Sequence, residues 1–181
     1  MNYFKFIYIS LLLVIIHYQS AQGQPIAQLS LVSGGNIDLH FNTLLKYQNG
    51  LIPNPTVFRV NWNENGSGDF NWRLTFYGDD GDGDDNFDGQ LNGNSLPMSD
   101  YFCLEASGTD GGSIYNTKPL KGPLNIQNIV ESGTDNATFT ITINYTFGVA
   151  GVNGDCNCSN LLGKNPDVYV FDLYFELTSD P

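Results

Sequence analysis

Apolar and polar residues alternate along several stretches of this chain, and this alternation constrains the fold more than any other feature. It runs unbroken over residues 70–76, 139–147 and 169–177. A period of two places every second side chain on one face of a β-strand, so each stretch predicts a strand that rests on a core. No window of helical length shows apolar residues spaced three and four apart. The chain is therefore expected to be all-β.

The same pattern continues, with less regularity, in other parts of the chain. Residues 37–47 begin with alternating apolar side chains and predict a strand, and residues 56–62 predict another. Trp62 and Trp72 fall on the inward faces of their strands, so both are expected in the core. Weaker strand candidates are residues 27–32, 101–106 and 124–130.

Clusters of Gly, Asn and Asp separate these stretches and predict turns between them. Seven to nine strands with polar connections predict an antiparallel β-sandwich, Ig-like in its general architecture, with a closed β-barrel as the alternative. No internal repeat and no linker divides the sequence. Residues 24–181 are therefore expected to form a single domain.

The first residues of the chain have a different character. Lys5 precedes an apolar run over residues 6–16, which has the length of a signal-peptide core and is too short for a membrane span. Ala21-Gln22-Gly23 supplies the small residues that signal peptidase requires, so cleavage is expected before Gln24. Residues 1–23 thus predict a signal peptide, with an uncleaved anchor as the alternative, and the protein is expected to be secreted or at the cell surface.

The charge balance limits the partners that the chain can bind. Seven Lys and Arg stand against nineteen Asp and Glu, and the formal net charge is −12. Nucleic acids and anionic membranes are recognised by clustered basic residues, so the sequence argues against both. It also predicts no insertion into a membrane after signal cleavage, because no second hydrophobic run follows. Cations and neutral ligands such as sugars remain as candidates.

Three cysteines follow the predicted signal peptide, and export makes a disulfide plausible for them. Cys103 paired with either Cys156 or Cys158 would close a long loop, worth about 4 kcal/mol of stability, and would leave one thiol. A bridge between Cys156 and Cys158 ranks second, because a spacing of one residue strains the disulfide. Zinc ranks lower still, since three Cys without a neighbouring His provide too few ligands.

An Asp-rich segment, residues 79–88, carries six carboxylates. Ca²⁺ takes six to eight oxygen ligands, and alternating Asp residues on a Gly-rich loop can supply them. Asp80, Asp82 and Asp84 match the first ligand positions of an EF-hand, and Asp88 is added as a fourth candidate ligand. The rest of the EF-hand pattern is missing, so the expected site is an irregular loop between two strands. The alternative is a solvated hairpin tip without a metal.

Catalytic motifs are absent from the sequence. His40 is the single histidine after the predicted signal peptide, and no Gly-x-Ser-x-Gly segment occurs. An enzymatic role is therefore not indicated, although nineteen acidic residues always leave room for a glycosidase-like carboxylate pair. Tyr174 lies on the strand face opposite Leu173, which makes it the candidate for stacking against a sugar ring.

Several short motifs follow one another in a characteristic order: Phe41-Asn42-Thr43, Tyr47-Gln48-Asn49-Gly50, Phe70-Asn71-Trp72-Arg73-Leu74, Leu96-Pro97-Met98-Ser99 and Leu161-Leu162-Gly163-Lys164. This order resembles small exported β-sandwich proteins of Bacteroidota-type bacteria that are loosely pilin- or adhesin-like. The resemblance implies a pilin-like sandwich and a role at the surface or in the matrix, and it implies no particular site. The Asp-rich segment and the Cys pair are not part of it.

Two functional hypotheses follow. The first is an exported, non-enzymatic structural or adhesive module, whose last strand is paired inside a sheet or is an edge able to join another sheet. Its partners would be surface or matrix proteins, glycans or further copies of the chain, and calcium would stabilise it if the Asp-rich segment binds metal. The second is a domain that binds or cleaves carbohydrate.

Overall fold

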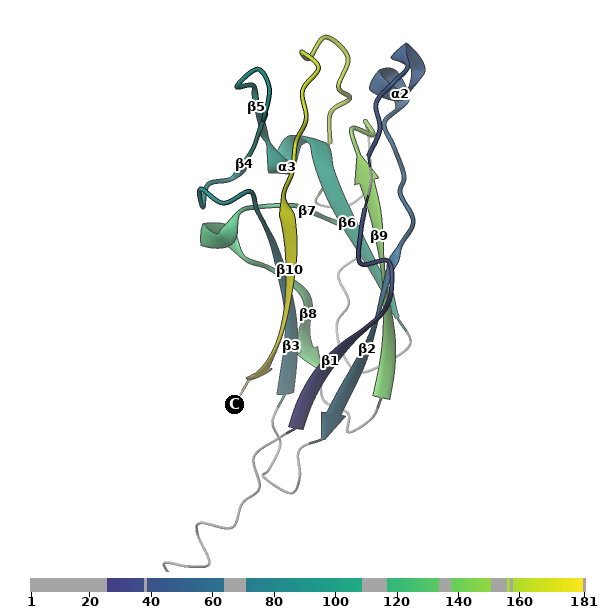
Figure 1. The fold of residues 1–181 in the computed structure, drawn as a ribbon. Coiled ribbons are helices and arrows are strands. Elements are labelled where there is room, and N and C mark those ends of the chain that lie inside the picture. Colours follow the sequence, from purple (N-terminus) through teal and green to yellow (C-terminus); the bar gives the residue numbers. More distant parts are fainter. Residues whose placement is uncertain are drawn as a thin grey trace, which may run out of the picture.

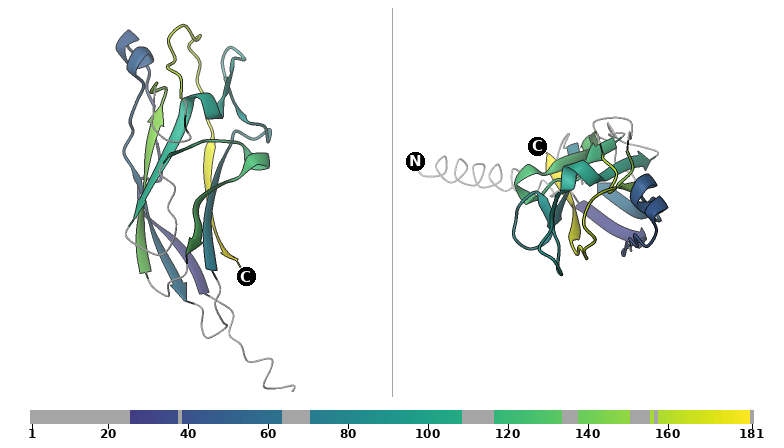
Figure 2. Two further views of the ribbon diagram at one scale, coloured as in Figure 1. Left: turned by 180° about the vertical axis from the view of Figure 1, so that it is seen from behind. Right: turned by 90° about the horizontal axis from the view of Figure 1, so that it is seen from above.

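The computed structural model describes residues 26–37, 39–63, 71–108, 117–133, 138–150, 156 and 158–180. The predicted signal peptide, residues 1–23, lies outside this range. The described residues form antiparallel sheets that do not close into a barrel, so the prediction of an all-β sandwich is confirmed. Figures 1 and 2 show two layers of strands that face each other along the length of the molecule.

The larger sheet has five strands and the smaller has three, and every neighbouring pair is antiparallel. In spatial order, the larger sheet contains β1 (Ile26–Ser33), β2 (Thr56–Asn63), β9 (Thr138–Phe147), β6 (Phe102–Gly108) and β7 (Thr117–Pro119). The smaller contains β10 (Asp172–Asp180), β3 (Asn71–Asp79) and β8 (Gln127–Gly133). A separate ladder joins β4 (Asn86–Asp88) to β5 (Ser95–Pro97).

The core lies between the two sheets and consists of the inward faces predicted from the alternation. Trp62 and Trp72 are 1% and 0% exposed, as expected from their positions. Trp72 of the smaller sheet stacks on Phe139 of the larger one, with ring centroids 5.5 Å apart. This ring pair therefore joins the two sheets across the core.

The prediction of a strand over residues 37–47 is wrong in its second half and incomplete in its first. A short helix, α2 (Leu44–Asn49), begins after Thr43, whose hydroxyl accepts a hydrogen bond from Lys46 N at 3.3 Å. Residues 39–42 keep the alternation, but within the described chain they join no ladder. The alternation marked the inward side chains correctly, but it gives no information about whether a neighbouring strand exists.

Other differences concern short elements. The predicted strand 169–177 begins as β10 only at Asp172, and Tyr169 makes a single isolated bridge with Gly89. The ladders of β4, β5 and β7 were not predicted. The remaining short helices are α3 (Met98–Tyr101) and η1 (Pro123–Asn125).

Both sheets end on the same side of the sandwich. Among the described residues, β1 pairs only with β2, and β10 pairs only with β3. Figure 1 shows these two edge strands close together at the end of the molecule where the chain terminates, and farther apart toward α2. The sandwich is therefore open along this side.

Candidate functional site

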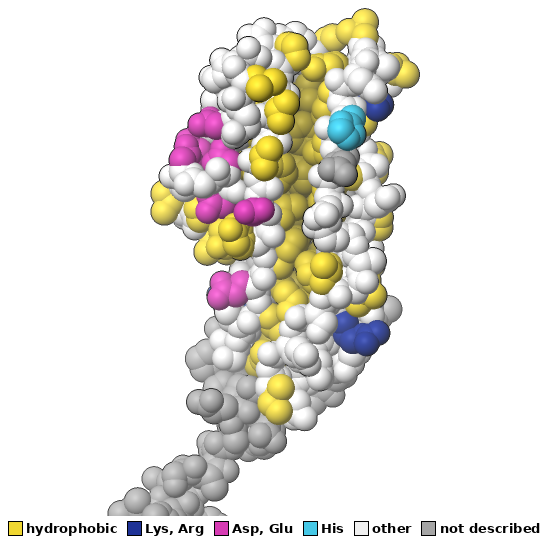
Figure 3. All heavy atoms as spheres, viewed as in Figure 1, with side chains coloured by type: hydrophobic (Ala, Val, Ile, Leu, Met, Phe, Trp, Pro, Cys, Tyr) yellow, Lys and Arg dark blue, Asp and Glu magenta, His cyan; other side chains and the backbone are white. Residues whose placement is uncertain are grey.

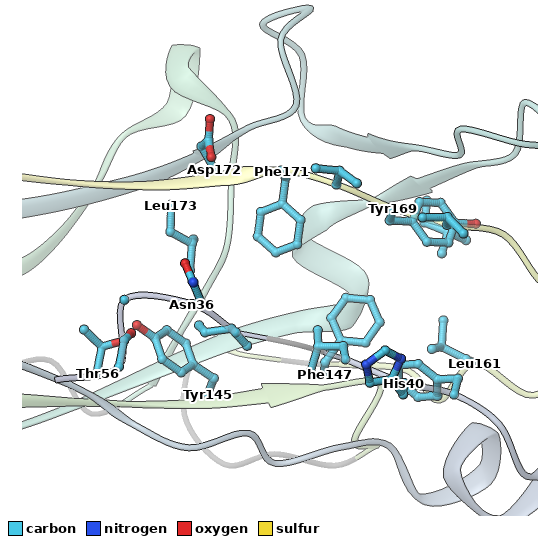
Figure 4. A pocket seen from close by; sticks show the side chains of 18 of the residues that line it. Asn36, His40, Thr56, Tyr145, Phe147, Leu161, Tyr169, Phe171, Asp172 and Leu173 are labelled. Atoms are coloured by element: carbon cyan, nitrogen blue, oxygen red, sulfur yellow. The ribbon is translucent and has the colours of Figure 1, made fainter.

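The open side of the sandwich carries a long apolar groove with a volume of about 1080 Å³. One wall is formed by β1 and residues 34–42, and the other by residues 164–171 and β10. Side chains of β2 and β9 form its floor, among them Phe58, Tyr145 and Phe147. Figure 3 shows the groove as a continuous hydrophobic band between the two layers, and Figure 4 shows the side chains that line it.

Alternation in the sequence builds both walls. Leu39 and Phe41 on one wall, and Phe171, Leu173 and Phe175 on the other, are directed inward and are half-buried. They pack onto the core, but among the described residues no strand lies between the two walls. The groove therefore exposes apolar side chains that a complete sandwich would cover.

A tight turn places the first wall. Gly34 follows β1 with φ of 78°, and a Cβ atom at this position would collide with the Pro55 carbonyl oxygen. Thr56 Oγ1 donates a 2.6 Å hydrogen bond to Gly34 O. Only glycine fits this position, and the turn leads the chain away from β1 along the rim of the groove.

Two tyrosines, Tyr145 and Tyr169, bring hydroxyl groups to the groove. Both hydroxyl oxygens are buried; that of Tyr145 lies beside the Thr56 side chain, whereas that of Tyr169 has no hydrogen-bond partner among the described residues. Burial raises the pKa of Tyr145 to about 12. Burial, followed by the charge of Asp167, also raises the pKa of Tyr169. Both hydroxyls therefore stay protonated at neutral pH, and that of Tyr169 keeps a donor for a ligand.

The carboxylate of Asp167 holds together the end of the groove that lies farthest from the C-terminus. This carboxylate accepts hydrogen bonds from Leu91 N at 2.9 Å, Asn92 N at 3.1 Å and Asn94 Nδ2 at 2.9 Å. It also accepts one from Val168 N at 2.8 Å. Partial desolvation alone would raise the pKa of Asp167, but these donors together lower it to about 2. The turn between β4 and β5 is thus tied to the wall that leads into β10.

Replacing Asp167 by asparagine should lower stability in a pH-dependent way. Folding lowers the pKa of Asp167 from its ordinary value of 3.8 to about 2. The ionised carboxylate therefore stabilises the fold above pH 3.8, and this contribution is lost as the pH falls toward 2. Denaturant unfolding at several pH values should show a constant deficit for Asp167→Asn above about pH 5, where the unfolded carboxyl is also ionised. The deficit should disappear near pH 2. A deficit that does not change with pH would contradict this role.

The Asp-rich segment forms a compact turn outside the groove. The structure brings oxygen atoms of Asp80, Asp82 and Asp84 within 4.8 Å of one another, and the carboxylate of Asp88 is not in this group. Instead, Asp88 N donates a 2.8 Å hydrogen bond to Asp80 Oδ2. Three of the four predicted metal ligands are therefore together.

Backbone N–H groups already donate hydrogen bonds to several carboxylates of this turn. Asp79 accepts from Gly81 N, Asp82 from Asp84 N and Asp84 from Asn86 N, at 2.6 to 2.9 Å, which are successive Asx turns. Hydrogen bonding to the backbone is an arrangement that the sequence argument did not consider. One oxygen is left over: Asp80 Oδ1 is buried and has no partner among the described residues. Burial, followed by the charges of Asp82 and Asp88, raises the pKa of Asp80.

Asp85, in the same segment, has a structural role that the sequence did not reveal. Its carboxylate accepts hydrogen bonds from Gly122 N and Asn125 Nδ2, both at 2.6 Å. These bonds join the Asp-rich turn to η1. Asp85 is therefore engaged within the fold and is a poor candidate for a metal ligand.

The three cysteines form a buried cluster. Cys103 on β6 lies within disulfide-bonding distance of both Cys156 and Cys158, and each is at most 3% exposed. One sulfur forms one disulfide, so the two pairs are alternatives and one thiol remains. The Cα–Cα distance is 6.2 Å for Cys156 and 7.0 Å for Cys158. Only the first lies within the usual range for a disulfide, which favours Cys103 with Cys156.

Tyr174 lies on the outer face of the smaller sheet. It is 42% exposed and stacks on Tyr77 of β3, with ring centroids 4.8 Å apart and an interplanar angle of 13°. One face of Tyr174 is therefore covered by its neighbour, and one face remains for a ligand. The charge of Asp172, followed by burial and the charge of Asp79, raises the pKa of Tyr174.

We compared the chain with known proteins. No family model, curated protein or solved structure matches it. A functional conclusion must therefore come from the geometry of the groove, the Asp-rich turn and the cysteine cluster. None of the described helices has the length and apolar character that crossing a membrane would require.

Proposed function

We propose that this protein is an exported, non-enzymatic structural or adhesive module of the cell surface or extracellular matrix. The observation that carries this proposal is the apolar groove between two edge strands, each without a second neighbour among the described residues. Exposed apolar patches bounded by polar residues are typical of protein interaction sites. Natural β-proteins usually protect such edges, so an open one indicates a partner.

The lining of the groove supports binding and not catalysis. Its described residues include no Ser, Cys or Glu that could act beside His40. Its two carboxylates are Asp167, which accepts five hydrogen bonds, and Asp172 on the rim of β10. The Bacteroidota-like order of motifs is consistent with a surface role, and the predicted signal peptide supports export.

Attachment of cells that produce the protein tests this proposal. Val170 lies on the rim of the groove and is 62% exposed, so Val170→Lys should block the groove and reduce attachment or matrix formation without unfolding the domain. The matched control is Leu124→Lys, since Leu124 is 85% exposed and lies on η1, outside the groove. Unchanged attachment after deletion of the gene would refute the proposal.

Carbohydrate binding is the second candidate, and the exposed face of Tyr174 is the observation that favours it. A glycan array combined with a hydrolysis assay tests it. Binding that disappears in Tyr174→Ala but persists in Val170→Lys would place the sugar on the outer face of the smaller sheet. Binding or turnover of sugar without any effect of groove variants would favour this candidate over the first.

We also propose that calcium stabilises the Asp-rich turn, with Asp80, Asp82, Asp84 and Asp88 as ligands. The three clustered carboxylates and the unsatisfied Asp80 Oδ1 support this. A ligand that binds only the folded state at a hundredfold excess over its Kd adds about 2.7 kcal/mol of stability. We expect the melting temperature to rise in millimolar calcium and to return with chelator.

The control for calcium is Asp82→Asn combined with Asp84→Asn. Asparagine keeps the side-chain oxygen that accepts the backbone hydrogen bonds at both positions, so the turn should persist while the charge is lost. This variant should lose the calcium shift and keep its melting temperature in chelator. Identical melting of the native chain in calcium and chelator, with no heat of binding, would contradict the metal site.

A further inference from the structure

We propose that the groove binds an extended segment of a different polypeptide as an added β-strand, with apolar side chains at alternate positions and Lys or Arg between them. This inference rests on the proposed function and names the partner of the same groove. The inserted strand would lie between residues 169–171 with the first residues of β10 on one side and residues 34–37 and 39–42 on the other. It would pair with the free edge of β10 and cover the apolar band shown in Figure 3.

The walls have the geometry of strands that lack a neighbour. Among the described residues β10 pairs only with β3, and its other edge faces the groove at its start and approaches β1 nearer the C-terminal end. Residues 39–42 on the opposite wall alternate like a strand, yet within the described chain they join no ladder. Backbone hydrogen bonds to such an edge give affinity, and pockets for alternate side chains give specificity.

The interior of the groove matches a strand with alternate apolar side chains. Figure 4 shows Phe171 and Leu173 directed across the groove toward the opposite wall, with Asn36 in the opening between Leu173 and Tyr145. An inserted strand would bring peptide groups to this wall. It would offer carbonyl oxygens to the hydroxyl of Tyr169, which has no partner among the described residues. Burying such a hydroxyl unsatisfied is costly, so an occupant that accepts its hydrogen bond is favoured.

The charge around the groove selects the polar residues of the partner. Figure 3 shows acidic side chains gathered on the side of the groove formed by the smaller sheet. There Asp172 on β10 lies opposite Asp79 on β3, and Glu176 follows four positions later on the same exposed face. Lys or Arg on the outward face of the added strand would complement these carboxylates.

The same charge argues against a second copy as the occupant. The chain carries a formal net charge of −12, so two copies repel each other, and each would bring its own Asp172 and Glu176 to the contact. A basic segment from another protein meets no such repulsion. Sedimentation of the signal-cleaved protein alone should therefore show a monomer with the groove open.

The test uses synthetic peptides of about nine residues, the length of β10, titrated into the signal-cleaved protein by calorimetry. A capped peptide of alternating Val and Lys should bind and should slow amide hydrogen exchange along β10. Three controls should each weaken binding at least tenfold. They are the same composition with all Val in one block, Glu in place of Lys, and N-methylation of the amides on the pairing edge.

Two protein variants separate the groove from general stability. Asn36 is exposed on the groove wall, so tryptophan at this position should fill the groove. Asn36→Trp should keep the melting temperature of the native chain and lower its affinity for the alternating peptide at least tenfold. Tyr169→Phe should leave the free protein no less stable, because the lost hydroxyl has no partner among the described residues, yet should weaken peptide binding. Leu124→Asn, outside the groove, should bind like the native chain.

Each outcome decides the inference. Equal binding of the alternating, blocked and N-methylated peptides, no binding of any peptide, or a groove filled by a second copy would overturn it. If no peptide binds while Val170→Lys abolishes cell attachment, the inserted strand is wrong and the proposed function stands. If the alternating peptide binds but attachment does not depend on the groove, the proposed function is wrong and the strand site stands.

Discussion

Replacing Trp72 by alanine should lower the free energy of unfolding by about 4 kcal/mol, the usual loss for a large buried aromatic side chain. Trp72 is fully buried on β3, the central strand of the smaller sheet, and it stacks on Phe139 of the larger one. The substitution would open a cavity where the two sheets meet. Domains of this size are stable by about 5–15 kcal/mol, so much of the total would be lost.

The control is Trp72→Phe, measured by the same denaturant unfolding. The indole Nε1 of Trp72 is buried and has no hydrogen-bond partner among the described residues. Phenylalanine keeps most of the contact with Phe139 and removes this unsatisfied donor, so the loss should stay below about 1.5 kcal/mol. If both substitutions lower the free energy of unfolding equally, the ring contact with Phe139 does not account for the stability that Trp72 contributes.

Replacing Cys103 by alanine should be comparably costly, because it removes both alternative disulfides at once. Closing the loop of 53 positions between Cys103 and Cys156 is worth about 4 kcal/mol in the chain-entropy description. Cys158→Ala should cost much less, since the favoured pair of Cys103 with Cys156 remains. Urea unfolding without reductant measures both losses.

Non-reducing peptide mapping identifies the bond directly. We expect Cys103 joined mainly to Cys156, with Cys158 as the thiol. Adding reductant should bring the native chain close to the stability of Cys103→Ala. Three free thiols in the protein isolated without reductant, or a bridge only between Cys156 and Cys158, would contradict the assignment.

The sequence predicted the inward faces of the sandwich well, because side-chain alternation is a local property. It could not predict the groove, because an unpaired edge depends on which strands become neighbours. Residues 39–42 illustrate the difference: their alternation correctly indicates a wall of apolar side chains, but the ladder that alternation normally implies is missing.

The polar contacts were partly readable from the sequence. Asp at intervals of two before a backbone donor, as in Asp82 with Asp84 and Asp84 with Asn86, is a signal for Asx turns that a search for metal ligands overlooks. Asp167 offers no such signal. Its partners lie more than seventy positions earlier, and only the folded chain brings them together.

The position of β10 in the chain has a consequence for how the protein folds. β10 pairs with β3, which precedes it by about a hundred residues, as in the contact of Thr75 with Glu176 across 101 positions. Pairing over such separations is slow, since a long loop must close before contacts form. Until β10 has been synthesised, the edge of β3 that it later covers is exposed and prone to aggregate. The incomplete chain would therefore need protection, and the groove itself cannot exist before β10 has been synthesised.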